Sequence, residues 1–407
     1  MVKSDLLQVF LSFSDVEIRE SKKFLRSPYF NKREDVIALF DFFIAQKNKS
    51  KPDFSSENAV LFLKKKLNVK EFKEDDFRYL MSYLLQLLYH FLSLQDWENN
   101  VIQKEISLQK KLSERNLEKL SERKAIKVIE LLEEQPLRDA RFHYQKHLYL
   151  LEKYNNVHKK RRSGEMFLEE MSEEFTKYYL SEALRQSCIL ISHQNVTKYE
   201  YDLSFSDELI RFVESKNYQN VVAIAVYYHS FLSLKNPDDE AHFFTLKNIL
   251  TTSWQAFPQE ETKDLYIIAI NYCIKKQNKG KSIFIREGFD LYLAGLENEV
   301  LLENNTMSVF TYQNIHLLAS KLGEFDWVEL FLQKYKAFLP AEQRENHYNF
   351  NIAQYYFRTK NYPKAMILLQ TIEFSDILHN LDARKMLLLD VPVFEILGII
   401  FLDTKIL

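Results

Sequence analysis

The chain has 407 residues, 46% of them hydrophobic and 28% charged, and its formal net charge is −2. One hydrophobic core stops growing at roughly 250–300 residues, so the length predicts two helical domains or one elongated helical array. The balance of 55 Lys+Arg against 57 Asp+Glu argues against a dedicated nucleic-acid coat, and the apolar fraction argues against global disorder.

Glycine is scarce: the chain contains only 6, and none precedes Gly164. Average usage is about 7%, and glycine is the residue that supplies tight turns and close backbone approach to phosphates. The composition therefore predicts an all-α fold with short polar loops. It also argues against a glycine-rich nucleotide-binding loop.

The two cysteines, Cys188 and Cys273, lie in apolar helical stretches and form no CxxC pair. They are interpreted as buried free thiols in a reducing compartment. The first residues lack the pattern of a signal peptide, and no apolar run reaches the roughly 18–20 residues that span a bilayer. We expect a cytoplasmic protein without membrane partners.

Helical spacing of apolar residues predicts helices along the whole chain, and no segment alternates long enough to predict a strand. Ser14 with Glu17, and Asn31 with Glu34, fit the capping pattern of a helix start. The predicted helices lie near 4–12, 15–25, 32–47, 56–66, 74–94, 97–115, 118–134, 137–155, 165–192, 207–215, 219–234, 238–255, 260–277, 282–297, 307–321, 325–338, 344–359, 363–373 and 380–389.

A polar, basic linker at 155–164 is the clearest break in composition. It predicts an N-terminal helical domain over 1–155 and a C-terminal domain over 165–407. For the N-terminal part the sequence leaves two architectures open, an irregular helical bundle and a set of degenerate repeats.

The stretch from Arg138 to Gly164 is strongly basic, with eight Lys/Arg against two acids and with interleaved tyrosines. Cations next to aromatic rings can hold phosphates and stack bases. The alternative is a solvated surface beside tyrosines that point into the core. The candidate anion-binding residues are Arg138, Arg141, Lys159, Lys160, Arg161 and Arg162.

Other patterns in the sequence do not predict a metal site, a phosphate-binding loop or a catalytic site. His143 and His147 are four residues apart, but no third metal ligand follows at a matching spacing. Gly280-Lys281-Ser282 ends like a phosphate-binding loop but lacks its earlier glycine and its preceding strand. No nucleophile elbow, zinc-protease motif or kinase set is present. We expect no metal, no cofactor and no catalytic residues, and hence no enzyme.

Similar turns recur in the second half of the chain, at 216–218, 323–325 and 360–362. The aromatics of the last two are 37 residues apart, a period typical of stacked helix pairs. Between 346 and 377, Ala353 and Ala365 stand 12 apart with large apolar residues around them. This pattern resembles the tetratricopeptide repeat over 309–377, although His316 and Val328 stand where that repeat has small residues.

The resemblance implies an α-solenoid of antiparallel helix pairs in the C-terminal half. It also implies a concave groove, lined by the first helix of each pair, that binds a protein or peptide. By position, the peptide-binding residues are Gln313, Lys321, Gln354 and Arg358. The chain as a whole resembles a bacterial family of helical-repeat proteins, which implies a fold and no particular activity. The expected function is therefore a non-catalytic scaffold, with nucleic-acid or anion binding at 138–162 as the alternative.

The segment 380–407 is apolar, whereas helical arrays usually end in a polar face. Three interpretations stay open: the segment pairs with a second copy in a homodimer, it packs on its own last repeat, or it is the remnant of a longer chain.

Overall fold

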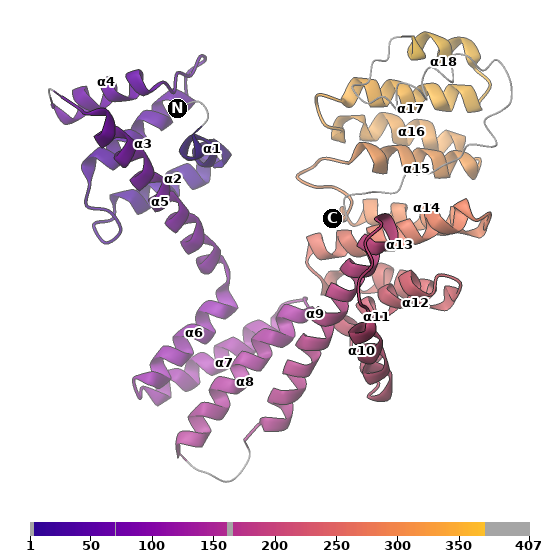
Figure 1. The fold of residues 1–407 in the computed structure, drawn as a ribbon, viewed down its shortest axis with the longest axis horizontal. Helices are drawn as coiled ribbons and strands as arrows, with labels where there is room; N and C mark the ends of the chain where they lie inside the picture. Colours follow the sequence, from indigo (N-terminus) through magenta and orange to yellow (C-terminus); the bar gives the residue numbers. More distant parts are fainter. Residues whose placement is uncertain (1–3, 70, 161–165, 371–407) are drawn as a thin grey trace. The chain divides into compact units, whose positions relative to one another are not determined.

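The structure is a computed structural model that describes residues 4–69, 71–160 and 166–370 (Figure 1). Over these ranges the chain forms 18 α-helices and three short 3₁₀-helices, and no β-strand. This confirms the predicted all-α class. None of the described helices is both long enough and apolar enough to cross a membrane.

Contacts divide the chain into two compact units, Met1–Val128 and Ile129–Leu407. The sequence had instead placed a domain boundary within 155–164. In the structure, residues 155–160 of that stretch form the last part of α8, and α8 and α9 pack against each other within the second unit. Seven helices begin in the first unit, and the last of them continues into the second: α1 (Asp5–Ser12), α2 (Asp15–Arg26), α3 (Glu34–Lys47), α4 (Ser56–Leu67), α5 (Glu74–Asn99), α6 (Val101–Glu114) and α7 (Glu118–Glu134).

Phenylalanine dominates the core of the first unit. Phe10 of α1 meets Phe40 of α3 edge to face, with ring centroids 5.6 Å apart, and both side chains are fully buried. Helices α1, α2 and α3 all pack on the long α5, which carries a buried stripe at helical spacing. Burial of these rings stabilises the unit.

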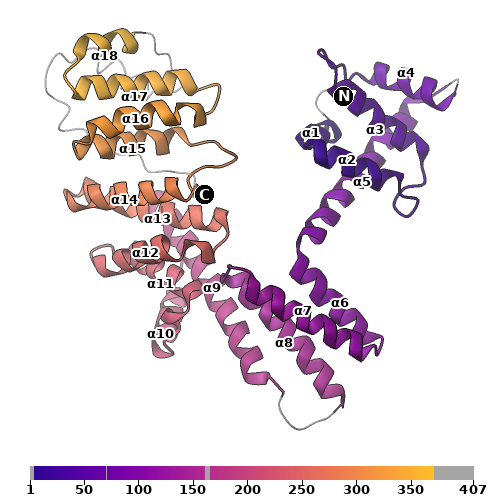
Figure 2. The same ribbon diagram turned by 180° about the vertical axis from the view of Figure 1, so that it is seen from behind.

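The second unit contains the remaining helices, which are α8 (Ala140–Lys160), α9 (Leu168–Val196), α10 (Ser204–Ser215), α11 (Val222–Lys235), α12 (Glu240–Thr252), α13 (Gln259–Asn278), α14 (Ile283–Glu297), α15 (Val309–Lys321), α16 (Phe325–Tyr335), α17 (Arg344–Arg358) and α18 (Tyr362–Leu369). From α11 onward each helix packs on the next, and first helices also contact first helices, as α11 does α13 and α15 does α17. In both views α15 to α18 lie as successive layers (Figures 1 and 2). This confirms a solenoid-like succession of helix pairs.

Three of these helix pairs turn in the same way. Gly280, Gly323 and Lys360 all have positive φ, and they stand 43 and 37 residues apart. In each case the next residue's N–H bonds back to a carbonyl in the last turn of the first helix, at 3.1, 3.0 and 2.7 Å. This is the 6→1 bond of a Schellman ending, which supports a repeating hairpin unit.

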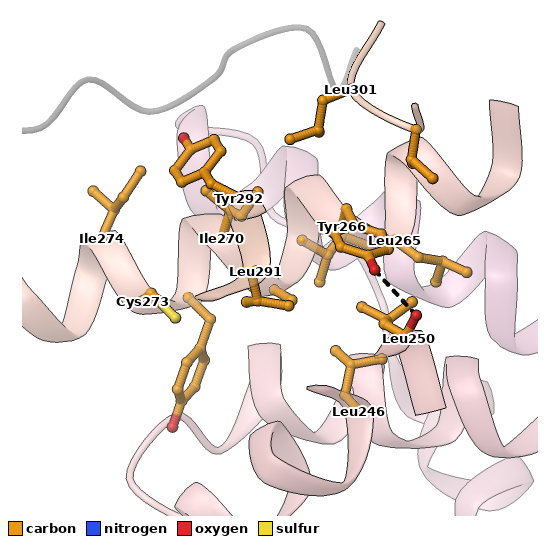
Figure 3. Packing of buried hydrophobic residues seen from close by; sticks show 14 of the residues in the cluster. Leu246, Leu250, Leu265, Tyr266, Ile270, Cys273, Ile274, Leu291, Tyr292 and Leu301 are labelled. Atoms are coloured by element: carbon orange, nitrogen blue, oxygen red, sulfur yellow. Dashed lines mark hydrogen bonds between the residues drawn. The ribbon is translucent and has the colours of Figure 1, made fainter. Parts of the chain in front are cut away.

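A continuous core connects the pairs (Figure 3). Tyr266 of α13 is buried, and its hydroxyl donates to the carbonyl of Leu250 in α12 at 3.1 Å. Gly288 lets α14 approach α13, because a Cβ at this position would stand 3.2 Å from that of Cys273. Ala353 and Ala365, predicted at the crossing of one pair, are both fully buried where α17 packs on α18.

Of the two helix caps predicted from the sequence, one is confirmed and one is wrong. Ser14 and Glu17 form the predicted reciprocal capping box of α2. The predicted cap at Asn31 is wrong: α3 begins at Glu34, after Arg33, and has no side-chain cap. The Asn31 amide instead donates to the carbonyls of Leu25 and Arg33, at 2.9 and 3.0 Å.

Candidate peptide-binding surface on α15 and α17

Two first helices of neighbouring pairs present polar residues at helical spacing. Helix α15 starts at a Ser308 cap, whose hydroxyl accepts from the Thr311 N–H at 3.0 Å. Spacings of three, four and seven residues place side chains on one face of a helix. We call the following set the α15/α17 polar face: Gln313, His316, Ser320 and Lys321 on α15, and Asn351, Gln354 and Arg358 on α17.

Much of this face is buried and lacks hydrogen-bond partners. Among the described residues, no partner is found for Gln313 Oε1 or for Ser320 Oγ on α15. The same holds for Gln354 Oε1 on α17. A buried polar atom without a partner costs roughly 1–3 kcal/mol, and such atoms are rare in native proteins. Their concentration on two adjacent helices marks this face as a candidate binding site.

The face also carries two cations, Lys321 and Arg358. Arg358 is half-buried, and no salt bridge or hydrogen bond to it is found within the described residues. Burial lowers its pKa, and burial together with the Arg358 charge lowers the pKa of Lys321. Burial, followed by the same Arg358 charge, lowers the pKa of His316 to about 3, so this ring is neutral at pH 7. A buried cation is stabilised by an anion, so the face is suited to a carboxylate.

The sequence had selected four of these residues by position: Gln313, Lys321, Gln354 and Arg358. The structure places them on α15 and α17, which contact each other, and electrostatics couples Lys321 to Arg358. Sequence reasoning missed His316, Ser320 and Asn351 as members of the face. The one available signal was His316 itself, which stands where the repeat has a small residue.

In the basic segment 138–162, the first arginine is bonded to nearby backbone carbonyls. Arg138 Nη1 donates to the carbonyls of Gln135 and Leu137, at 2.6 and 2.7 Å, and its guanidinium lies 4.5 Å from the Phe142 ring centroid. These bonds hold Arg138 to the loop before α8. Arg141 is exposed.

The other cations of this segment have acidic neighbours or lie beyond the described side chains. Lys146 Nζ lies 3.2 Å from Glu174 and 3.5 Å from Glu170, so α9 supplies acids that neutralise this part of α8. Lys159 and Lys160 end α8, with side chains that are not described, and Arg161 and Arg162 lie outside the described residues. Of the six predicted anion-binding residues, only Arg138 and Arg141 thus have described side chains, and the anion site stays a prediction.

His143 and His147 do not face a common ligand. His143 Nδ1 lies 2.6 Å from Glu174 Oε2, and His147 Nδ1 lies 3.0 Å from the Met171 carbonyl. Among the described residues, no group of three or more His, Cys, Asp or Glu side chains is arranged to hold a metal ion.

A separate hollow lies beside the loop between α14 and α15. Lys263, Glu303, Thr306 and Ser308 line it, and the ion pair of Lys263 with Glu303 crosses it at 2.7 Å. Since this lysine is already paired, the hollow presents no free cation comparable with Arg358.

Comparisons with known proteins returned no matching protein family, no matching curated protein and no matching solved structure.

Proposed function

We propose that the protein is a non-catalytic, tetratricopeptide-like scaffold that binds a protein or peptide partner on the α15/α17 polar face. The observation that carries this proposal is the row of buried polar atoms on adjacent first helices, Gln313 Oε1 and Gln354 Oε1 among them, without partners in the described chain. A bound peptide would supply the missing partners.

The chemistry of the face defines the ligand. Glutamine carbonyl oxygens accept hydrogen bonds, and they suit the backbone N–H groups of an extended peptide. Arg358 presents a planar fork that matches a carboxylate. The preferred partner is therefore a segment with exposed backbone and an acidic side chain or terminus near Arg358.

Affinity capture with the full chain and two charge-reversed variants tests this function. Arg358→Glu should remove particular captured proteins, because it replaces the unpaired cation of the face with an acid. Arg211→Glu is the matched control, since Arg211 is an exposed arginine on α10 of the same unit. Proteins retained by the wild type and by Arg211→Glu, but lost with Arg358→Glu, are the expected result.

Identical sets of proteins captured by all three forms would contradict the proposal. A captured partner is then tested by titration against the double variant Gln313→Ala with Gln354→Ala. We expect its Kd to rise by tenfold or more, about 1.4 kcal/mol per tenfold. Unchanged affinity in the double variant would place the binding site elsewhere.

A further inference from the structure

Helix α9 carries apolar side chains on two opposite sides. One side is buried: Leu184 lies in the core, and Cys188 Sγ donates to the Tyr227 carbonyl of α11 at 3.4 Å. The other side faces solvent, and Phe175 there is 47% exposed. Phe175 stands nine residues before Leu184, which is about two and a half helical turns, so the two side chains point in opposite directions. An ordinary amphipathic surface helix is instead polar on its solvent side.

The exposed apolar residues of α9 follow a regular spacing. They are 44–55% exposed, and we call them the α9 seam: Leu168, Phe175, Tyr179, Ile189 and Val196. Counted from Leu168, all but Tyr179 stand at multiples of seven residues, and Tyr179 stands four residues after Phe175. A stripe that repeats every seven residues, with a second position four residues on, is the contact surface of a coiled coil.

No described helix of the second unit covers this seam. Helices α8, α10 and α11 pack on α9, and α8 reaches only the edge of the seam, where the rings of His147 and Phe175 lie 5.1 Å apart. Helix α9 has 29 residues, so the seam extends over about 40 Å. Large apolar patches are rare on the surfaces of monomeric proteins and mark sites of interaction. The seam therefore indicates a partner that presents a helix of similar length.

The charges of α9 differ between its two halves. Residues 168–182 contain five acids and one lysine, whereas 183–198 contain Arg185 and Lys198 and no acid. An antiparallel second copy of α9 would lay the acidic half of each helix along the basic half of the other. A parallel copy would place acids opposite acids, and flanking charges of this kind set the orientation of paired helices.

We propose that the α9 seam is a contact between two copies of this chain, which pair α9 against α9 in antiparallel orientation. A two-fold interface must be self-complementary, so that each residue meets a residue which meets it in return. The seam has this symmetry about Glu182. Leu168 and Val196 are both fourteen residues from Glu182, and Phe175 and Ile189 are both seven residues from it.

The residues nearest the axis are compatible with this pairing. Glu182 lies 3.6 Å from Arg185 on its own helix, so the acid at the axis has a cation beside it in each copy. Tyr179 and Arg185 are each three residues from Glu182, so Tyr179 meets the partner's Arg185. A guanidinium over a tyrosine ring is a favourable contact. This interface is separate from the α15/α17 polar face, and either can be disproved without the other.

Sedimentation equilibrium of the full chain tests the association. The wild type should be dimeric at roughly tens of micromolar, and Phe175→Glu combined with Ile189→Glu should raise the dimer dissociation constant by about tenfold or more. Both positions are exposed, and circular dichroism checks that the helix content is unchanged. Leu330→Glu, at a 68% exposed position of α16, is the matched control and should leave the dimer unchanged. A monomeric wild type, or a dimer that the double variant does not weaken, overturns the proposal.

Thiol crosslinking with a short bis-maleimide tests the orientation. Leu168→Cys combined with Val196→Cys should give covalent dimers, because position 168 of one copy lies beside position 196 of the other. Either substitution alone should give none, since the two copies of one position then lie at opposite ends of the pair. The native Cys188 and Cys273 are buried and should not contribute. Covalent dimers from Leu168→Cys alone would show parallel pairing and overturn the proposal, as would their absence from the double variant.

Discussion

His143 of α8 and Glu174 of α9 meet in a buried contact, with Nδ1 2.6 Å from Oε2. Lys146 and Lys177 lie 3.2 and 3.3 Å from the other carboxylate oxygen. These contacts join α8 to α9, and the Glu174 carboxylate makes the stability of their packing dependent on pH.

The first prediction concerns Glu174→Gln. Burial acts to raise the pKa of Glu174, but the hydrogen bond from His143 and the neighbouring cations outweigh it and lower the pKa to about 2. The ionised form therefore stabilises the fold above pH 4.5, and this contribution is lost as pH falls from 4.5 towards 2. We expect the variant to lose about 2–3 kcal/mol of unfolding free energy at pH 7, measured by urea denaturation.

The loss should shrink as pH falls below 4.5, because the carboxyl of the unfolded chain is then protonated while that of the folded protein is still ionised. Glu169→Gln, at an exposed site on the same helix, is the control and should change little. A loss at Glu174 that is independent of pH would mean that packing, and not charge, joins α8 to α9.

The second prediction concerns a histidine pair on α11 and α12. His229 Nδ1 lies 3.0 Å from His242 Nδ1, and burial, followed by the charge of His242, lowers the pKa of His229 to about 4. The neutral ring is the stable form in the fold, so stability falls as pH decreases from 6.5 to 4. His229→Phe keeps a ring but takes no proton.

We expect the wild type to lose about 1–3 kcal/mol more than His229→Phe between pH 6.5 and 4, measured by denaturation at each pH. Parallel pH profiles for the two proteins would show that His229 does not titrate with unfolding.

The third prediction compares two equivalent turns. Lys360 has φ of +62°, and Gly323 occupies the same position one pair earlier with φ of +80°. A side chain in this conformation costs roughly 1 kcal/mol. Lys360→Gly should therefore stabilise the protein by about 0.5–1 kcal/mol, and Gly323→Ala should destabilise it by a similar amount.

Thermal and urea denaturation measure both changes. At Gly323 no atom lies within 4 Å of an added Cβ, so the cost there is conformational and not steric. Destabilisation by Lys360→Gly would show that the lysine side chain contributes more than its backbone strain costs.

The fourth prediction concerns the thiols. Cys188 and Cys273 are both buried, and burial raises the pKa of each. The thiolate is the reactive form, so neither should react with an alkylating reagent in the native protein at pH 8. Both should react in guanidinium, as counted by mass spectrometry. Labelling of the native protein at either position would contradict the packing of α9 or α13.

Local rules predicted much of this fold and little of the site. Helical spacing of apolar residues located every described α-helix to within a few residues. The Asn31 cap failed because a competing bond to Leu25, six residues away, was not visible in the sequence. Likewise, the bonds of Arg138 to nearby carbonyls depend on a loop conformation that no composition rule supplies.

On α15 and α17, the resemblance selected residues by position, but the polar face depends on contact between two helices. His316 and Asn351 are 35 residues apart in the chain, and Asn351 affects the His316 pKa only because the pairs stack. Spacing within one helix contains no information on such a contact. The 371–407 segment, including the predicted dimer region 380–407, lies outside the described residues.

Photocrosslinking from Gln354 tests the central claim most directly. A photoreactive residue at this half-buried position of α17, introduced into the full chain in cells, reports what touches the face. The account predicts crosslinks to one partner segment, while the same probe at Leu330 gives none. Partner crosslinks from Leu330 but not from Gln354 would contradict it.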